Sequence, residues 1–89
     1  MQWTGLAKVG EEAAEVVQEV MKVIATDGDL IYGNGMELCE QHLWDELGDL
    51  IAAIRYFVEK NSVPVSYLEA RATLKRLQYE EWFERERVR

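Results

Sequence analysis

The chain has 89 residues, and with 17 acidic and 10 basic side chains its formal net charge at pH 7 is -7. Nucleic-acid-binding modules normally present a basic face, so this balance argues against DNA or RNA as a partner. Cys39 is the only cysteine, which excludes an internal disulfide. The longest apolar run, residues 50–54, is far too short to cross a membrane. With no hydrophobic leader, we expect one domain over residues 1–89, in the cytoplasm and without a membrane partner.

The first predicted helix covers residues 4–26. Its apolar residues recur at steps of three and four, which places them on one face. They are Val9, Ala13, Val16, Val17, Val20 and Ile24. Thr4 is the expected N-cap, and Asp27-Gly28-Asp29 is expected to end the helix. Residues 27–35 hold three glycines and are expected to form a loop.

Two further helices are predicted, one over residues 36–61 and one beginning after Pro64. The stripe of the second helix is Leu43, Leu47, Leu50, Ile54, Phe57 and Val58. Ser66 is the expected cap of the third helix, with Glu69 completing a capping box. The apolar residues of the third helix are Tyr67, Ala70, Leu74 and Leu77, and its pattern turns irregular around Tyr79, Trp82 and Phe83. No strand-like alternation appears, so the predicted fold class is all-α, a three-helix protomer with two long antiparallel helices.

The second predicted helix is apolar on more than one side. Trp44, Ile51 and Ala52 lie away from its main stripe. Three helices of one chain would not cover all of this surface, and a helix that is apolar nearly all round is usually buried. We therefore expect a homodimer or homotetramer in which the helices form a joint bundle.

Two pairs of acidic residues stand at the same spacing on the first two helices. Glu12 and Glu15 are three residues apart, as are Glu46 and Asp49. Each pair projects from adjacent turns and flanks an apolar stripe. If the stripes pack antiparallel, four carboxylates converge and need a cation to offset their repulsion. Mg²⁺ fits because it prefers oxygen ligands, keeps waters and accepts phosphate oxygens. The alternative is a solvated acidic surface with ordinary pairs to nearby lysines.

The two acidic motifs also carry a resemblance to a known family. Residues 6–17, LAKVGEEAAEVV, resemble the E-E-x-x-E helix of the MazG-like all-α nucleotide pyrophosphohydrolases. Residues 45–54, DELGDLIAAI, resemble the E-x-x-D helix of the small phage and bacterial members. The resemblance covers about residues 5–60, and the third helix more loosely.

This resemblance implies an oligomeric enzyme that converts a nucleoside triphosphate and water into the monophosphate and pyrophosphate. It implies Mg²⁺, with Mn²⁺ as a possible substitute, held by Glu12, Glu15, Glu46 and Asp49. It also implies that Glu11 is a secondary acid that orients a metal or the attacking water. For catalysis we expect Glu11 or Glu12 to help deprotonate this water.

Four residues are candidates for substrate binding. Lys8 lies near the first acidic pair, and His42 lies one turn before Glu46. Lys75 can reach phosphates from the third helix, and Trp3 can stack on a base. Tyr32 and Trp44 are further aromatic residues that can stack on a base. Arg71 and Arg76 are further basic residues that can reach phosphates from the third helix. Packing or solvated roles remain open for each of them, and Arg55 is expected to lie off the acidic face.

Two other functions remain open on the sequence. Residues 8–15 are also similar to the motif of phosphoribosyl-ATP pyrophosphatase of histidine biosynthesis, which cleaves the same bond in a different nucleotide. A non-catalytic helical dimerisation module would need none of the four acids. The sequence does not decide between removal of abnormal nucleotides and control of the nucleotide pool.

Overall fold

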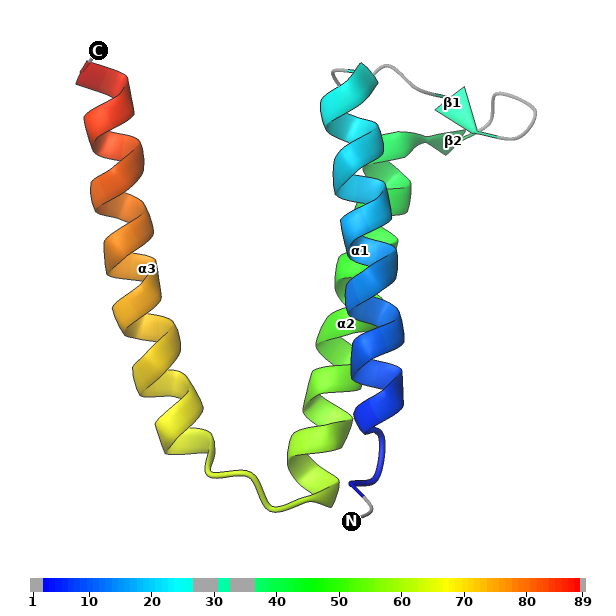
Figure 1. Cartoon of the computed structure of the whole chain (residues 1–89), viewed down its shortest axis with the longest axis vertical. Helices are drawn as coiled ribbons and strands as arrows, with labels where there is room; N and C mark the ends of the chain where they lie inside the picture. Colours follow the sequence, from blue (N-terminus) through cyan, green and yellow to red (C-terminus); the bar gives the residue numbers. More distant parts are fainter. Residues whose placement is uncertain (1–2, 27–30, 33–36, 89) are drawn as a thin grey trace.

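The computed structural model describes residues 3–26, 31–32 and 37–88. Three helices make up most of this part of the chain (Figure 1). They are α1 (Leu6–Thr26), α2 (Cys39–Lys60) and α3 (Val65–Val88). The predicted all-α class is confirmed. None of the helices in the described ranges is long and apolar enough to cross a membrane.

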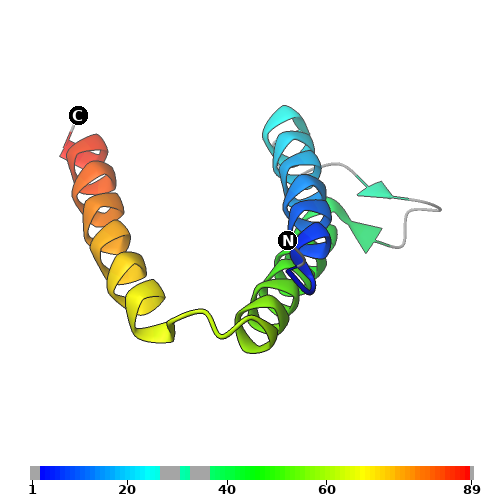
Figure 2. The same cartoon turned by 60° about the horizontal axis from the view of Figure 1, so that its bottom comes forward.

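The helices α1 and α2 pack antiparallel along their length (Figures 1 and 2). Their contact is lined by half-buried apolar side chains, namely Val9, Val16, Val20, Leu43, Leu50 and Phe57. Ala53 is the one fully buried apolar residue in the described part of the chain. At the end of the hairpin where α1 begins and α2 ends, Asn61 links the two segments. Its Nδ2 donates to the carbonyl oxygens of Thr4 and Phe57, each at 2.8 Å. This antiparallel pair is the frame that positions the acidic residues.

The starts of two helices differ from the predicted caps. The helix α1 begins at Leu6, after Gly5 with a φ of 83°, and the backbone N–H of Leu6 donates to the Trp3 carbonyl at 3.1 Å. Thr4 therefore lies in a turn before the helix and is not its N-cap. At α3 the Pro64 carbonyl accepts the first helical hydrogen bonds, from the N–H groups of Tyr67 and Leu68.

The predicted capping box of α3 is consequently wrong. Ser66 lies inside the first turn because α3 already begins at Val65. The helix also continues unbroken to Val88, through the part where the apolar pattern turns irregular.

Two short strands that the sequence did not predict lie between α1 and α2. They are β1 (Ile31–Tyr32) and β2 (Glu37–Leu38), which pair antiparallel with Ile31 opposite Leu38. β1 falls within the predicted loop, and α2 begins directly after β2. Residues 37–38, which were predicted to be helical, form β2, so the predicted start of the second helix is wrong and α2 begins at Cys39. Met36 itself lies outside the described residues.

The third helix stands apart from the hairpin in both views of the chain (Figures 1 and 2). The large apolar side chains along it are exposed: Tyr67, Leu74, Leu77, Tyr79, Trp82 and Phe83. The radius of gyration is 16.4 Å, against about 12 Å for a compact domain of this length. The protomer alone therefore leaves much of its apolar surface uncovered.

Candidate metal centre

The antiparallel register of α1 and α2 brings together the four carboxylates that the sequence pairs two by two. Oxygens of Glu12, Glu46 and Asp49 all lie within 4.8 Å of one another. Glu12 also belongs to a second group, with Glu11 and Glu15, whose carboxylate oxygens likewise lie within 4.8 Å of one another. Because residues three apart lie on adjacent turns of one face, each helix contributes its pair to the same side of the hairpin. Glu12 is the residue that joins the two groups.

Glu12 is a buried acidic residue. It is 7% exposed, and its Oε2 has no hydrogen-bond partner among the described residues. Oε2 of Glu46 is buried in the same way, without a donor from that part of the chain. A buried carboxylate oxygen without a donor is costly, because it loses its water and gains no partner. A cation between the two helices would supply the missing interaction for both oxygens.

Glu15 adds a contact between carboxyl groups across the two helices. Its carboxyl group lies within hydrogen-bonding reach of that of Glu46. This contact raises the pKa of Glu15, and burial together with the charge of Glu46 raises it further. A bound divalent cation would favour the ionised form of Glu15.

Lys8 is the cation that the chain itself supplies to the acidic residues. Its Nζ lies 3.2 Å from Oε1 of Glu12 and 3.4 Å from Oε1 of Glu11. The hydrogen bond to Glu12, followed by that to Glu11, raises the pKa of Lys8 above its ordinary value. One ammonium group facing four carboxylates and Glu11 leaves a large negative excess. The oxygen-only donor set and this excess suit Mg²⁺.

A hollow of about 510 Å³ adjoins the acidic residues, and its lining includes Lys8, Glu12 and Asp49. The rest of its wall is formed by Ala52, Ala53 and Tyr56 of α2. The sequence analysis missed Tyr56. Its signal was nevertheless present, because Tyr56 follows Asp49 by seven residues and two full helical turns return to the same face.

The structure brings some of the other candidate residues to this site and not others. His42 is half-buried one turn before Glu46, but it belongs to neither acidic group and does not line the hollow. Trp3 packs on Phe57, with ring centroids 6.0 Å apart, and does not line the hollow. Lys75 lies on α3, away from the acidic residues, and its Nζ bonds Oε1 of Gln78 at 3.3 Å. Arg71 and Arg76 lie on the same helix, so none of these three basic residues reaches the acidic centre.

Residues proposed for other roles lie apart from the acidic centre. Arg55 lines a separate hollow with Val58 and Leu68, which agrees with its expected place off the acidic face. Trp44 is exposed, and the side chain of Tyr32 lies outside the described residues.

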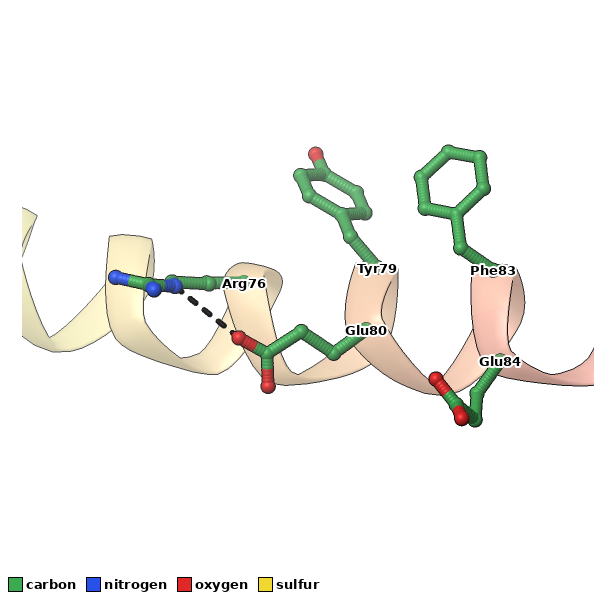
Figure 3. A pocket seen from close by; sticks show the side chains of 5 residues that line it. All are labelled: Arg76, Tyr79, Glu80, Phe83 and Glu84. Atoms are coloured by element: carbon green, nitrogen blue, oxygen red, sulfur yellow. Dashed lines mark hydrogen bonds and ion pairs between the residues drawn. The ribbon is translucent and has the colours of Figure 1, made fainter.

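A small hollow on α3 is formed by that helix alone (Figure 3). Tyr79 and Phe83 project to one side, beside the ion pair that joins Arg76 Nε to Glu80 Oε1 at 3.2 Å. This surface is an uncovered aromatic stripe with an intrahelical ion pair. Among the described residues, those of this surface form no group of acidic side chains like the one between α1 and α2.

Comparison with known proteins gives no family model, no curated protein and no solved structure that matches this chain. The resemblance to the MazG-like family therefore stays a prediction that rests on the two acidic motifs. The function has to be argued from the site.

Proposed function

We propose that the protein is a Mg²⁺-dependent nucleoside triphosphate pyrophosphohydrolase. It would convert a nucleoside triphosphate and water into the nucleoside monophosphate and pyrophosphate. The observation that carries the proposal is the pair of buried oxygens, Oε2 of Glu12 and Oε2 of Glu46, which have no donor in the described part of the chain. They lie between two helices that also bring Glu15 and Asp49 into reach.

The carboxylate oxygens of the site fit a magnesium ion that is also coordinated by the phosphate oxygens of a substrate. Glu12, Glu46 and Asp49 offer oxygens close enough to one another to hold one ion, and Glu15 adds a fourth carboxyl group. Asp49 is exposed, and the adjoining hollow leaves room for substrate beside it. When bound, Mg²⁺ neutralises phosphate charge and lowers the pKa of a coordinated water.

The protein's own residues would perform the remaining steps. Glu15, whose pKa is raised by its contact with Glu46, would be ionised when it holds the metal. Glu11 is exposed at the edge of the acidic group, where it can accept the proton of the water that attacks the α-phosphorus. Lys8, which lies 3.2 Å from Glu12, would donate to a phosphate oxygen. The water oxygen would form a bond to the α-phosphorus as the bond from that phosphorus to the bridging oxygen breaks, and pyrophosphate would leave. Phosphoryl transfer depends mainly on such positioning and charge stabilisation.

We further propose that the active form is a homodimer or a larger homo-oligomer. The chain exposes 7371 Å², whereas a compact monomer of its mass exposes about 5,400 Å². The excess, about 2,000 Å², is on the scale of obligate interfaces. The outward apolar residues of the hairpin are Leu6, Val17, Met21, Ile24, Leu47, Ile51 and Ile54. Helical periodicity places them on the side opposite the acidic residues.

The proposed reaction is tested by incubating the protein with each common ribo- and deoxyribonucleoside triphosphate and Mg²⁺, and resolving the products. We expect the monophosphate and pyrophosphate in equal amounts, and none with EDTA. Lys8→Met should raise KM for the nucleotide several-fold, because it removes a phosphate contact. Lys22→Met, which removes the partner of Glu19 two turns further along α1, is the matched control and should leave KM unchanged. Release of a nucleoside diphosphate and orthophosphate would refute the proposal.

A further inference from the structure

The hollow beside the acidic residues has two chemically different ends. At one end Glu12 and Asp49 present carboxylates, and at the other the ring of Tyr56 forms an aromatic wall. Ala52 and Ala53 lie between them, so the space is left open by the smallness of two side chains. Its volume, about 510 Å³, is in the range of small-molecule sites.

The position of the Tyr56 ring is set by the chain around it. An atom built at the Cβ position of Gly5 would lie 3.1 Å from Cδ2 of Tyr56, so the backbone there approaches the ring closely. The φ of Gly5, 83°, is one that favours glycine, and it permits this approach. From the side of α2, Nζ of Lys60 lies 5.6 Å from the ring centroid. The ring is therefore supported from two sides while it remains 49% exposed.

We infer that this hollow is the nucleoside subsite of the proposed enzyme, with the base stacked on Tyr56. The inference rests on the proposed function, since it takes the acidic end as the place of the phosphates. Tyr56 follows Asp49 by seven residues, which separates the two by about 10.5 Å along the helix axis. A nucleotide spans a distance of that order between its phosphate chain and its base.

The chemistry of the walls selects a nucleoside over other occupants. A flat aromatic ring stacks on any base, because every base offers a π-face. Lys8 lies along the wall of α1, between the aromatic end and the carboxylates. The apolar floor offers no charged group to a sugar or base. An occupant with a polyanionic group at both ends is disfavoured, because only one end of the hollow carries the carboxylates that hold a cation. A long apolar chain is disfavoured because it would leave Glu12 and Asp49 without a partner.

The position of the hollow also keeps it accessible in the proposed oligomer. Helical periodicity places Tyr56 and Ala52 on the flank of α2 opposite Ile51 and Ile54. The apolar face that a second copy would cover therefore lies on the other side of the hairpin. The subsite and the interface do not compete for the same surface.

The test compares Tyr56→Ala and Tyr56→Phe, with Tyr67→Ala on α3 as the matched control. Binding of each nucleoside triphosphate and of inorganic tripolyphosphate is measured by calorimetry with Mg²⁺. We expect Tyr56→Ala to weaken nucleotide binding roughly tenfold, within the range for stacking one base on an aromatic side chain, and to leave tripolyphosphate binding unchanged. Tyr56→Phe, which keeps the ring, and Tyr67→Ala should bind nucleotides as the wild type does.

A second variant tests the hollow without removing the ring. Ala52→Leu fills the space with a residue that favours helices, and it should raise the nucleotide KM at least as much as Tyr56→Ala does. Ala14→Leu makes the same change on the exposed side of α1 and should have no effect.

Ring resonances of Tyr56, assigned by their absence from Tyr56→Phe, should shift when a nucleoside monophosphate is added. A shift without any turnover would refute the proposed reaction but support the subsite. Turnover that is insensitive to Tyr56→Ala and Ala52→Leu, or a ring that no nucleotide shifts, would overturn the subsite.

Discussion

Replacing Glu46 by Gln should raise the stability of the metal-free protein and abolish its response to Mg²⁺. The change keeps the volume of the side chain and removes one charge. Oxygens of Glu46 and Glu12 lie within 4.8 Å of each other. At that distance two like charges repel by about 0.9 kcal/mol at the dielectric constant of water and by about 3.5 kcal/mol at an effective value of 20.

The expected gain of the metal-free variant lies between these limits, at about 1–3 kcal/mol. The new amide can also donate a hydrogen bond to Oε2 of Glu12, which has no donor in the described part of the wild-type chain. For a domain of this size, 1 kcal/mol corresponds to a melting-temperature change of roughly 4–8 °C. The melting temperature of Glu46→Gln in EDTA should therefore rise by at least about 5 °C.

The response to Mg²⁺ should change in the opposite sense. At 100 times its dissociation constant, a ligand that binds only the folded state stabilises it by about 2.7 kcal/mol. In the wild type this corresponds to a rise in melting temperature on the order of 10 °C. In Glu46→Gln the Mg²⁺-induced rise in melting temperature should be lost together with turnover, because the ion between the two helices loses a ligand that α2 supplies.

The assay is a thermal melt of both proteins with Mg²⁺ and with EDTA, beside a turnover measurement. Glu59→Gln is the matched control, since Glu59 is an exposed residue of α2 outside the acidic groups, and it should retain both turnover and the Mg²⁺ response. A Glu46→Gln protein that stays active and shows the wild-type Mg²⁺ shift would refute the assignment of Glu46 as a ligand.

Four further outcomes follow from the structure. Ile51→Arg places a charge on the exposed apolar face of the hairpin and should give a monomer of lower melting temperature by light scattering and calorimetry; an intact oligomer would contradict the proposed interface. Because the hydrogen bond with Glu46 raises the pKa of Glu15, Mg²⁺ affinity measured by calorimetry should fall as the pH is lowered from neutrality. For the same reason the metal-free protein should lose stability as the pH rises from the ordinary pKa of a glutamate to the raised one, because the folded state binds that proton more tightly; a melting temperature that rises across this window would oppose the prediction. Gly5→Ala should lower stability by about 1–2 kcal/mol, because its φ is left-handed and the new Cβ meets Tyr56; an unchanged melt would show that the turn relaxes.

The features that depend on helical period were predictable from the sequence. The spacing of Glu12 with Glu15 and of Glu46 with Asp49 predicts their convergence once α1 and α2 pack antiparallel, and the structure brings them together. The ends of the helices were less predictable. At α3 the Pro64 carbonyl is the first helical acceptor, and local sequence preference had favoured Ser66 as the cap.

The spacing places Tyr56 on the same face of α2 as Asp49, but neither the hollow beside it nor the position of α3 could be read from the pattern. The hollow that Tyr56 lines with Ala52 and Ala53 is a product of packing between α1 and α2. The apolar residues of α3 lie on two sides of the helix, for example Leu74 on one and Phe83 on the other, so no single stripe predicts a partner.

The reaction itself is tested most directly by the fate of oxygen from water. Hydrolysis is run in water enriched in ¹⁸O with Mg²⁺ and a nucleoside triphosphate that the protein turns over, and the products are analysed by mass spectrometry. Attack at the α-phosphorus predicts one ¹⁸O atom in the nucleoside monophosphate and none in the pyrophosphate. Label in the pyrophosphate, or in orthophosphate, would place the attack on another phosphorus and contradict the proposed reaction.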